Sequence, residues 1–340
     1  MKDTDLALEM LYGPPLTVVS ECIRGMIIAP PGYDTIAADF SNIEGRGLAW
    51  LAGEDWKMQA FRDYDAGTGP DLYKVTASEI LGKSIDAVTK DERQSTGKVP
   101  ELACGYQGST GAFQKMAVNY GLRITDREAL AIVKGWRSKN SNIVSLWKET
   151  EAAAIAAVQN PGQVTRCAGG RVKYRKAGSF LFCQLPSGRC LSYPYPRLVD
   201  YVWTERKKAD NERESRRIPY SELATWRERG WTSNGEISPA LHYKYVDPLS
   251  RKWVEGPTYG GSLVENITQA MCRDIMAEAM QRVEKAGYEV VLTVHDEIIA
   301  YVKKTFGSLD EFVALLIQQP VWAAGMPIAA EGWRGHRYRK

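Results

Sequence analysis

The chain has 340 residues, of which 44% are apolar and 25% are charged, and its formal net charge is +3 at pH 7. These values are ordinary for a globular protein, and a chain of this length can bury a large core and form two subdomains. The sequence has no run of roughly eighteen apolar residues, which excludes a transmembrane helix, and its first residues lack the apolar core of a signal peptide. We therefore expect a cytoplasmic protein without membrane contacts.

Cysteine and histidine are too few and too scattered for a disulfide or zinc framework. The chain has six cysteines, no Cys-x-x-Cys pair and three histidines. We therefore expect neither a disulfide scaffold nor a zinc site. Basic residues cluster between residues 206 and 217, where acidic residues also occur. That cluster is equally compatible with a solvated surface and with a nucleic-acid contact.

The first informative segment is residues 35–46. Residues 35–40 are a short apolar run after two prolines and a glycine, which predicts a buried strand ending near Asp39. Ser41 and Glu44 have the spacing of a capping box, which predicts that a helix begins there. Asp39 would then lie at a strand-to-helix turn, where its carboxylate can reach a cleft.

The middle of the chain has mainly helical patterns. We predict helices at residues 71–81, 126–136 and 143–158, a hairpin at 184–196, and an irregular polar surface insertion at 203–257. A long helix is predicted at residues 260–286. Residues 289–302 alternate in polarity, which predicts a hairpin with Asp296 and Glu297 at its turn.

Two aspartates and a lysine-bearing helix indicate phosphate chemistry. Lys98, Leu102 and Tyr106 are spaced four apart and would share one helix face, with a charge for phosphate and a flat ring for a base or sugar. If their strands lie side by side, Asp39 and Asp296 can hold Mg²⁺, which prefers oxygen ligands. Phosphoryl transfer commonly uses two such ions about 3.5–4 Å apart. The residues thus predict a site that moves nucleotide phosphates with metal ions.

Three segments, in this order, resemble motifs A, B and C of family A DNA polymerases, the family of bacterial polymerase I and many phage replicases. They are Asp39-x-Ser41-x-x-Glu44-x-Arg46, then Arg93 followed by Lys98 and Tyr106, and finally Val294-His295-Asp296-Glu297. The resemblance implies an α+β fold: a right-hand polymerase palm on an antiparallel sheet, with helical fingers and the thumb largely absent. It places the palm at residues 1–47 and 186–340, the latter including the 203–257 insertion, and the fingers at residues 48–185.

The resemblance also implies an activity and a role for single residues. The activity is template-directed addition of dNTPs to a primer 3′ end with release of pyrophosphate, using two Mg²⁺ ions for which Mn²⁺ can substitute. Catalysis would depend on Asp39, Asp296, Lys98 and Glu297, with metal held by Asp39, Asp296 and the backbone carbonyl of Phe40. The dNTP would contact Glu44, Arg93, Lys98, Leu102, Tyr106 and His295, and Glu44 with Tyr106 would exclude a ribose 2′-hydroxyl. Primer-template DNA would contact Arg24, Arg189, Asn266, Gln269 and His295.

Three positions depart from the family pattern. Arg93 lies five residues before Lys98, where the family has four, and five residues turn an α-helix by roughly 140° beyond one full circle. Arg93 would then reach phosphate only from a looser segment, and Pro100 would kink the helix or mark its start. Leu102 stands where the family often has an aromatic residue, which predicts altered discrimination against dideoxynucleotides. Asn266 lies three rather than four residues before Gln269.

The segment before Asp39 is too short for a thumb of normal size or for an exonuclease. We therefore expect either a naturally split polymerase or a truncated form, with a separate polypeptide that supplies the thumb and the 3′–5′ exonuclease. Two other functions stay open: a single-subunit RNA polymerase and a non-catalytic DNA-binding accessory subunit. The ratio of dNTP to rNTP incorporation distinguishes the first, and DNA binding without any synthesis would indicate the second.

Overall fold

The computed structural model describes residues 2–207 and 213–338, so residues 208–212 of the basic cluster lie outside the described part. The chain forms two compact units: unit 1 comprises residues 1–43 and 272–340, and unit 2 comprises residues 44–271. Residues 186–271 group with the helices of unit 2, whereas their sequence resemblance assigns them to the palm. The palm and fingers boundaries at 47/48 and 185/186 stay predictions. Within the described residues, no helix is long and apolar enough to span a membrane.

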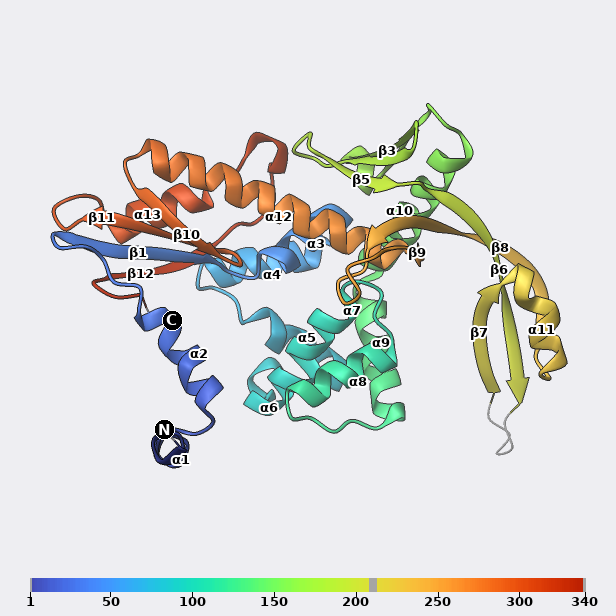
Figure 1. The fold of residues 1–340 in the computed structure, drawn as a ribbon, viewed down its shortest axis with the longest axis horizontal. Coiled ribbons are helices and arrows are strands. Elements are labelled where there is room, and N and C mark those ends of the chain that lie inside the picture. The colour runs from blue at the N-terminus through green and yellow to red at the C-terminus, as the bar shows by residue number, and fades with distance from the viewer. Residues whose placement is uncertain (1, 208–212, 339–340) are drawn as a thin grey trace. The chain divides into compact units, whose positions relative to one another are not determined.

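A sheet with the strand order β10-β11-β1-β12 is the centre of unit 1 (Figure 1). β1 is antiparallel to both of its neighbours, β11 and β12. The elements of unit 1 are α1 (Lys2–Tyr12), α2 (Pro15–Gly25), β1 (Tyr33–Phe40), β10 (Glu289–Val294), β11 (Glu297–Lys303), α13 (Leu309–Ile317), the 3-10 helix η5 (Val321–Ala323) and β12 (Ala330–Gly335). Two helices cross the division between the units, namely α3 (Ile43–Ala52) and α12 (Gly260–Lys285).

The core of unit 1 follows the apolar patterns of the sequence. Ile36 and Ala37 in β1 are fully buried, which confirms the predicted strand at residues 35–40. The C-terminal half of α12 buries Ile275, Ala279 and Val283, whose four-residue spacing defines one helix face. α13 packs against β1 and β12. Because these apolar faces are covered, the sheet holds its strands in a single register.

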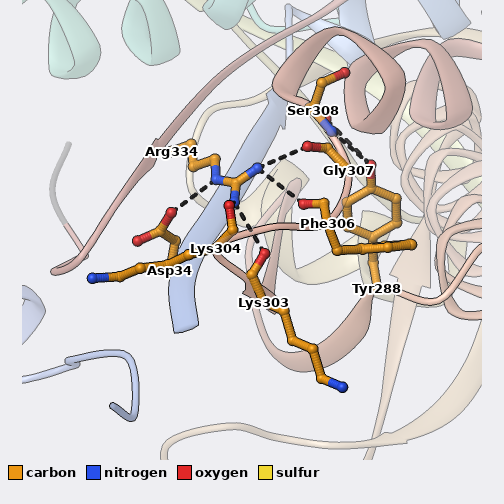
Figure 2. Close-up of polar contacts among 8 residues, drawn as sticks. All are labelled: Asp34, Tyr288, Lys303, Lys304, Phe306, Gly307, Ser308 and Arg334. Atoms are coloured by element: carbon orange, nitrogen blue, oxygen red, sulfur yellow. Dashed lines mark hydrogen bonds and ion pairs between the residues drawn. The ribbon is translucent and has the colours of Figure 1, made fainter. Parts of the chain in front are cut away.

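One arginine of β12 organises the loop that follows β11 (Figure 2). Arg334 donates to the carbonyl oxygens of Lys303 and Lys304 at 3.1 Å, of Phe306 at 3.1 Å and of Gly307 at 2.9 Å. Its Nε donates to Asp34 Oδ2 at 3.0 Å. The planar guanidinium therefore satisfies four backbone carbonyls and one carboxylate together, a geometry that a lysine cannot reproduce.

We expect Arg334→Ala to lower the free energy of unfolding by about 1–3 kcal/mol, because it removes the donor from the partly buried Asp34 and from four carbonyls of the exposed loop. Urea denaturation followed by circular dichroism measures the change. Arg337→Ala is the matched control, since Arg337 is exposed and donates to the carbonyl of Gly25. A loss for Arg334→Ala no larger than that of the control would contradict this account.

Helices occupy most of residues 44–160 in unit 2. They are α4 (Asp55–Asp65), α5 (Leu72–Leu81), the 3-10 helix η1 (Ile85–Ala87), α6 (Lys90–Glu92), the π-helix η2 (Arg93–Lys98), α7 (Val99–Cys104), α8 (Thr110–Asn119), α9 (Asp126–Lys139) and α10 (Ser141–Gln159). The helices predicted at residues 71–81, 126–136 and 143–158 are thus confirmed as α5, α9 and α10. The predicted capping box at Ser41 is wrong in register, because Asn42 has φ 48° and α3 begins at Ile43.

A buried ion pair and a pair of tryptophans hold these helices together. Trp136 of α9 stacks on Trp147 of α10 with ring centroids 6.3 Å apart. Lys57 of α4 pairs with Glu101 of α7 at 2.6 Å, and Lys57 is 2% exposed. The hydroxyl of Thr76 in α5 donates to the other oxygen of Glu101 at 2.8 Å. Glu101 therefore fixes α7 to both α4 and α5.

Two antiparallel sheets complete unit 2. One has the order β2-β3-β4-β5, formed by β2 (Val164–Cys167), β3 (Val172–Ala177), β4 (Phe180–Gln184) and β5 (Cys190–Pro194), with the 3-10 helix η3 (Ala168–Gly170) between β2 and β3. The other has the order β7-β6-β8-β9, formed by β6 (Arg197–Lys207), β7 (Arg213–Pro219), β8 (Thr232–Val246) and β9 (Trp253–Thr258), with η4 (Tyr220–Glu222) and α11 (Leu223–Glu228) after β7. The β4–β5 hairpin confirms the predicted hairpin at residues 184–196.

The prediction of an irregular segment at residues 203–257 is wrong, because this segment forms most of a sheet. Its strands bury few aliphatic residues, so alternation alone gives a weak signal. Val202, Ile218 and Leu223 form a small apolar cluster. Cation–π contacts add to it: Arg206 lies 4.9 Å from the ring of Trp231, and Arg216 lies 5.8 Å from that of Trp226. Glu214 accepts from both arginines, which neutralises part of the basic cluster.

Candidate active site

Asp39 of motif A lies near the end of β1, and Asp296 of motif C lies in the turn that precedes β11, the strand paired with β1. Asp39, next to last in β1, is directly opposite Glu297, the first residue of β11. The backbone N–H of Phe40 donates to the carbonyl of Asp296 at 3.2 Å. The strand that carries Asp39 is therefore paired with the strand that Asp296 immediately precedes, as expected if the two carboxylates act together.

Asp296 lies in a tight turn. β10 ends at Val294 and β11 begins at Glu297, and these two residues pair, so His295 and Asp296 form a two-residue hairpin loop. His295 has φ 56°, a conformation that glycine usually provides at this position of a hairpin turn. Such backbone costs about 1–3 kcal/mol and is common at functional sites. The predicted hairpin is confirmed, with Asp296 in its turn and Glu297 at the start of the returning strand.

The donor set of unit 1 fits a magnesium site. Among the described residues no group of three or more His, Cys, Asp or Glu side chains could hold a metal. Mg²⁺, however, is usually bound through one or two protein carboxylates together with substrate phosphates and water. Asp39 in β1 and Asp296 in the turn before the paired strand β11 provide two hard oxygen ligands, and the carbonyl of Phe40 adjoins Asp39. The residues present are therefore compatible with the metal that the sequence predicts.

Motif B has an unexpected backbone in unit 2. Residues Arg93–Lys98 form the π-helix η2, in which hydrogen bonds close over five residues, and α7 follows with Pro100 in its first turn. In such a helix residues five apart lie nearly one above the other, so the extra residue between Arg93 and Lys98 is absorbed. The prediction that Lys98, Leu102 and Tyr106 share one regular helix is therefore wrong. It fails at Tyr106 as well, because α7 ends at Cys104 and Tyr106 lies in the turn after it.

The charged residues of motif B have defined neighbours. Arg93 pairs with Asp71, the N-cap of α5, through Nη2 at 2.8 Å and Nε at 3.0 Å, and its guanidinium lies 5.0 Å from the ring of Tyr73. The hydrogen bonds to Asp71 raise the pKa of Arg93. Lys98 lies 5.5 Å from the ring of Tyr120. Leu102, one turn of helix beyond Lys98, is 41% exposed, so it is available to a ligand.

Glu44 and Tyr106 meet in unit 2, as motifs A and B predict. The Tyr106 hydroxyl donates to Glu44 Oε2 at 3.2 Å. Their neighbour Gly261 lies at the start of α12, and the sequence motifs do not point to it. A Cβ at Gly261 would lie 2.3 Å from the carbonyl oxygen of Tyr106, and its N–H donates to Gln107 Oε1 at 2.8 Å. Glycine at 261 thus allows α12 to approach the Tyr106 turn.

Three residues predicted to contact DNA gather around α12 in unit 2. Arg189, in the turn between β4 and β5, donates to the carbonyl of Ala270 at 2.7 Å. Asn266 donates to the hydroxyl of Tyr193 at 3.4 Å, and Gln269 is exposed. Arg24, predicted for the same role, lies in α2 of unit 1 with its guanidinium 5.9 Å from the ring of Tyr338. The predicted site residues are therefore distributed over both units.

Comparison with known proteins shows similarity to one family. Residues 14–176 match the family model described as DNA polymerase family A. The DNA polymerase of Bacillus phage SP02 is 35% identical over 336 residues, which cover 98% of this chain and 45% of the relative. DNA polymerase I of Pseudomonas aeruginosa is 30% identical over 141 residues, covering 42% of this chain and 14% of the relative.

The fold agrees with this result. The POL domain of Pol1 from M. smegmatis, in complex with DNA primer-template and dNTP, matches with a TM-score of 0.54 and 17% identity, covering 96% of this chain and 43% of that chain. The predicted α+β class is confirmed, and the fold is that of a polymerase domain. The chain is similar to DNA polymerase family A over residues 14–176 and to a phage DNA polymerase over almost its whole length. It spans less than half the length of the phage relative.

Proposed function

We propose that the chain carries out template-directed DNA synthesis, adding dNTPs to a primer 3′ end with release of pyrophosphate. The observation that carries this proposal is the pairing of β1 with β11, which supports Asp39 and Asp296 as a pair of acidic ligands. The match to family A polymerases and the ordered motifs B and C give independent support.

The residues of the two units would have different roles, with metal binding in unit 1 and contacts to the triphosphate in unit 2. Asp39, Asp296 and the carbonyl of Phe40 would hold Mg²⁺, for which Mn²⁺ can substitute. Such ions, when bound, activate the attacking oxygen and stabilise the leaving one. Lys98 would meet the triphosphate as a point charge and donate a proton to the departing pyrophosphate. Arg93 would also reach the triphosphate. The triphosphate would then compete with Asp71 for the guanidinium of Arg93.

DNA and the nucleotide would be oriented by the remaining residues. Arg189, Asn266 and Gln269 would contact primer or template through the α12 region, with Arg24 and His295 contributing from unit 1. Leu102 would pack beside the incoming sugar. We keep the division into a palm of residues 1–47 and 186–340 and fingers of residues 48–185 as part of this proposal.

Sugar selection would depend on Glu44 and Tyr106. We expect Glu44→Ala to raise the ratio of rNTP to dNTP incorporation about 10- to 100-fold, because the carboxylate that crowds the ribose 2′-hydroxyl is removed. Tyr106→Phe, which loses only the hydroxyl that fixes Glu44, should raise it less. Single-turnover incorporation of ATP and dATP opposite the same template base measures both. An unchanged ratio in Glu44→Ala would refute this role.

Primer extension by the purified chain tests the function as a whole. Extension with dNTPs but not rNTPs is the expected result and excludes a single-subunit RNA polymerase. DNA binding that survives Asp296→Asn, with no synthesis under any condition, would favour the alternative of a non-catalytic accessory subunit. No observation in the described residues favours that alternative, since Asp39, Lys98, Tyr106 and Asp296 all lie in ordered elements or turns.

A second polypeptide that supplies a thumb and a 3′–5′ exonuclease would complete the enzyme. Support comes from residues 10–26, in and directly after α1 and α2, where large apolar side chains are exposed: Met10 by 80%, Leu16 by 85% and Met26 by 76%. Exposed apolar side chains gathered in one segment are a feature of interaction sites. The six free cysteines, four of them buried, fit a reducing compartment, which supports the cytoplasm as the place of action.

A further inference from the structure

A buried tyrosine contacts the glutamate of motif C. Glu297 and Tyr338 are each 2% exposed, and the Tyr338 hydroxyl donates a short hydrogen bond to Glu297 Oε2. Tyr338 follows β12, and its backbone N–H donates to the carbonyl of Ile27 at 2.9 Å. Its ring lies 5.7 Å from that of Trp333, and the guanidinium of Arg24 lies 5.9 Å from its centroid. The hydroxyl is therefore held in place from three segments of unit 1.

The hydrogen bond from Tyr338 to Glu297 offsets an unfavourable arrangement of charge in the candidate site. Asp39 lies directly opposite Glu297 across β1 and β11, and like charges in such pairs repel each other. A carboxylate in the interior also needs a donor in place of water. Burial and the contact with Glu297 raise the pKa of Tyr338 to about 12, so the hydroxyl keeps its proton at any working pH. Tyr338 thus supplies a permanent donor that draws the Glu297 carboxylate into the core.

We propose that Tyr338 is a positioning residue: by holding Glu297 in the interior, it fixes the first residue of β11 and with it the hairpin turn that carries Asp296, and so preserves divalent-cation binding. The inference rests on the proposed function, since it assumes that Asp39 and Asp296 bind the metal. Neither motif C nor the spacing around it points to residue 338, because the contact forms only when the end of the chain returns to the sheet.

The test compares Tyr338→Phe in the wild-type chain and in a Glu297→Gln background. Binding of Mn²⁺, followed by electron paramagnetic resonance without substrates, is the first readout, and the Mg²⁺ concentration for half-maximal primer extension is the second. We expect Tyr338→Phe to weaken Mn²⁺ binding about 5-fold or more, with the KM for primer-template unchanged. In Glu297→Gln, which lacks the carboxylate that Tyr338 holds, the same change should have an effect below about 1.5-fold. Tyr338→His, which retains a ring donor, should bind Mn²⁺ within about 2-fold of the wild type.

Tyr301→Phe is the control. Tyr301 lies in β11, the strand that begins at Glu297, and its hydroxyl donates to the carbonyl of Ile28 at 3.4 Å and not to a carboxylate. This variant should match the wild type in both readouts. Wild-type Mn²⁺ affinity in a folded Tyr338→Phe chain, or equal losses in the two backgrounds, would overturn the inference. If Asp296→Ala leaves Mn²⁺ binding unchanged, Asp296 does not bind the metal. That result would refute the metal site of the proposed function and, with it, the role of Tyr338.

Discussion

Alanine at Asp39 or at Asp296 is expected to lower the rate constant of primer extension by about 1,000-fold or more. The expectation follows from the pairing of β1, which carries Asp39, with β11, which Asp296 immediately precedes. Removing one of them leaves a single protein carboxylate for the metal, and metal-ion stabilisation contributes several kcal/mol to phosphoryl transfer, where about 1.4 kcal/mol is tenfold in rate. Rapid-quench extension of a labelled primer by one nucleotide measures the loss.

The control must remove a carboxylate without removing the pair. Glu289 begins β10 in the same hairpin, is exposed, and lies opposite Tyr301 rather than near the turn. Glu289→Ala should extend primers within about twofold of the wild type. Circular dichroism should give the same spectrum for all three variants. A variant of Asp39 or Asp296 that keeps most of the rate would exclude the pair as the metal site.

The part of the site that could be predicted is the part encoded locally. An apolar run before Asp39 and an alternating segment around Asp296 are enough to predict a buried strand and a hairpin, and the structure contains both. The register between them follows from burial, because a shift by one residue would expose Ile36 and Ile298. Motif matching then assigned Glu44 and Tyr106, whose contact is present.

The parts that could not be predicted depend on long-range contacts. Helix periodicity assumes 3.6 residues per turn, so it could not anticipate the π-helix that absorbs the extra residue after Arg93. The sheet of β6 to β9 was not predicted because its apolar cluster is small and joins residues far apart in the sequence, with arginines against tryptophan rings beside it. Gly261 and Tyr338 owe their importance to neighbours more than 40 residues away, namely Tyr106 and Glu297. No local pattern carries that information.

The π-helix makes Gly97 the position of motif B that is most sensitive to substitution. Gly97 is buried, and a Cβ there would lie 2.1 Å from the carbonyl oxygen of Tyr73 and 2.8 Å from its carbonyl carbon. Both atoms belong to the backbone of α5, so they cannot swing aside as a flexible side chain would. An added methyl group must therefore push η2 away from α5. That movement separates Arg93 from Asp71, which caps α5, and displaces Lys98 at the end of η2.

We expect Gly97→Ala to lower the free energy of unfolding by about 3 kcal/mol or more and to raise the KM for dNTPs about 10-fold or more. Gly111→Ala is the matched control: Gly111 lies in α8 with no atom within 4 Å of its added Cβ. Because alanine favours helix more than glycine does, this control should be neutral or up to about 1 kcal/mol more stable. Urea denaturation measures the free energy of unfolding of both variants, and steady-state kinetics measure their KM for dNTPs. Equal behaviour of the two variants would mean that η2 does not pack against α5 as closely as this geometry requires.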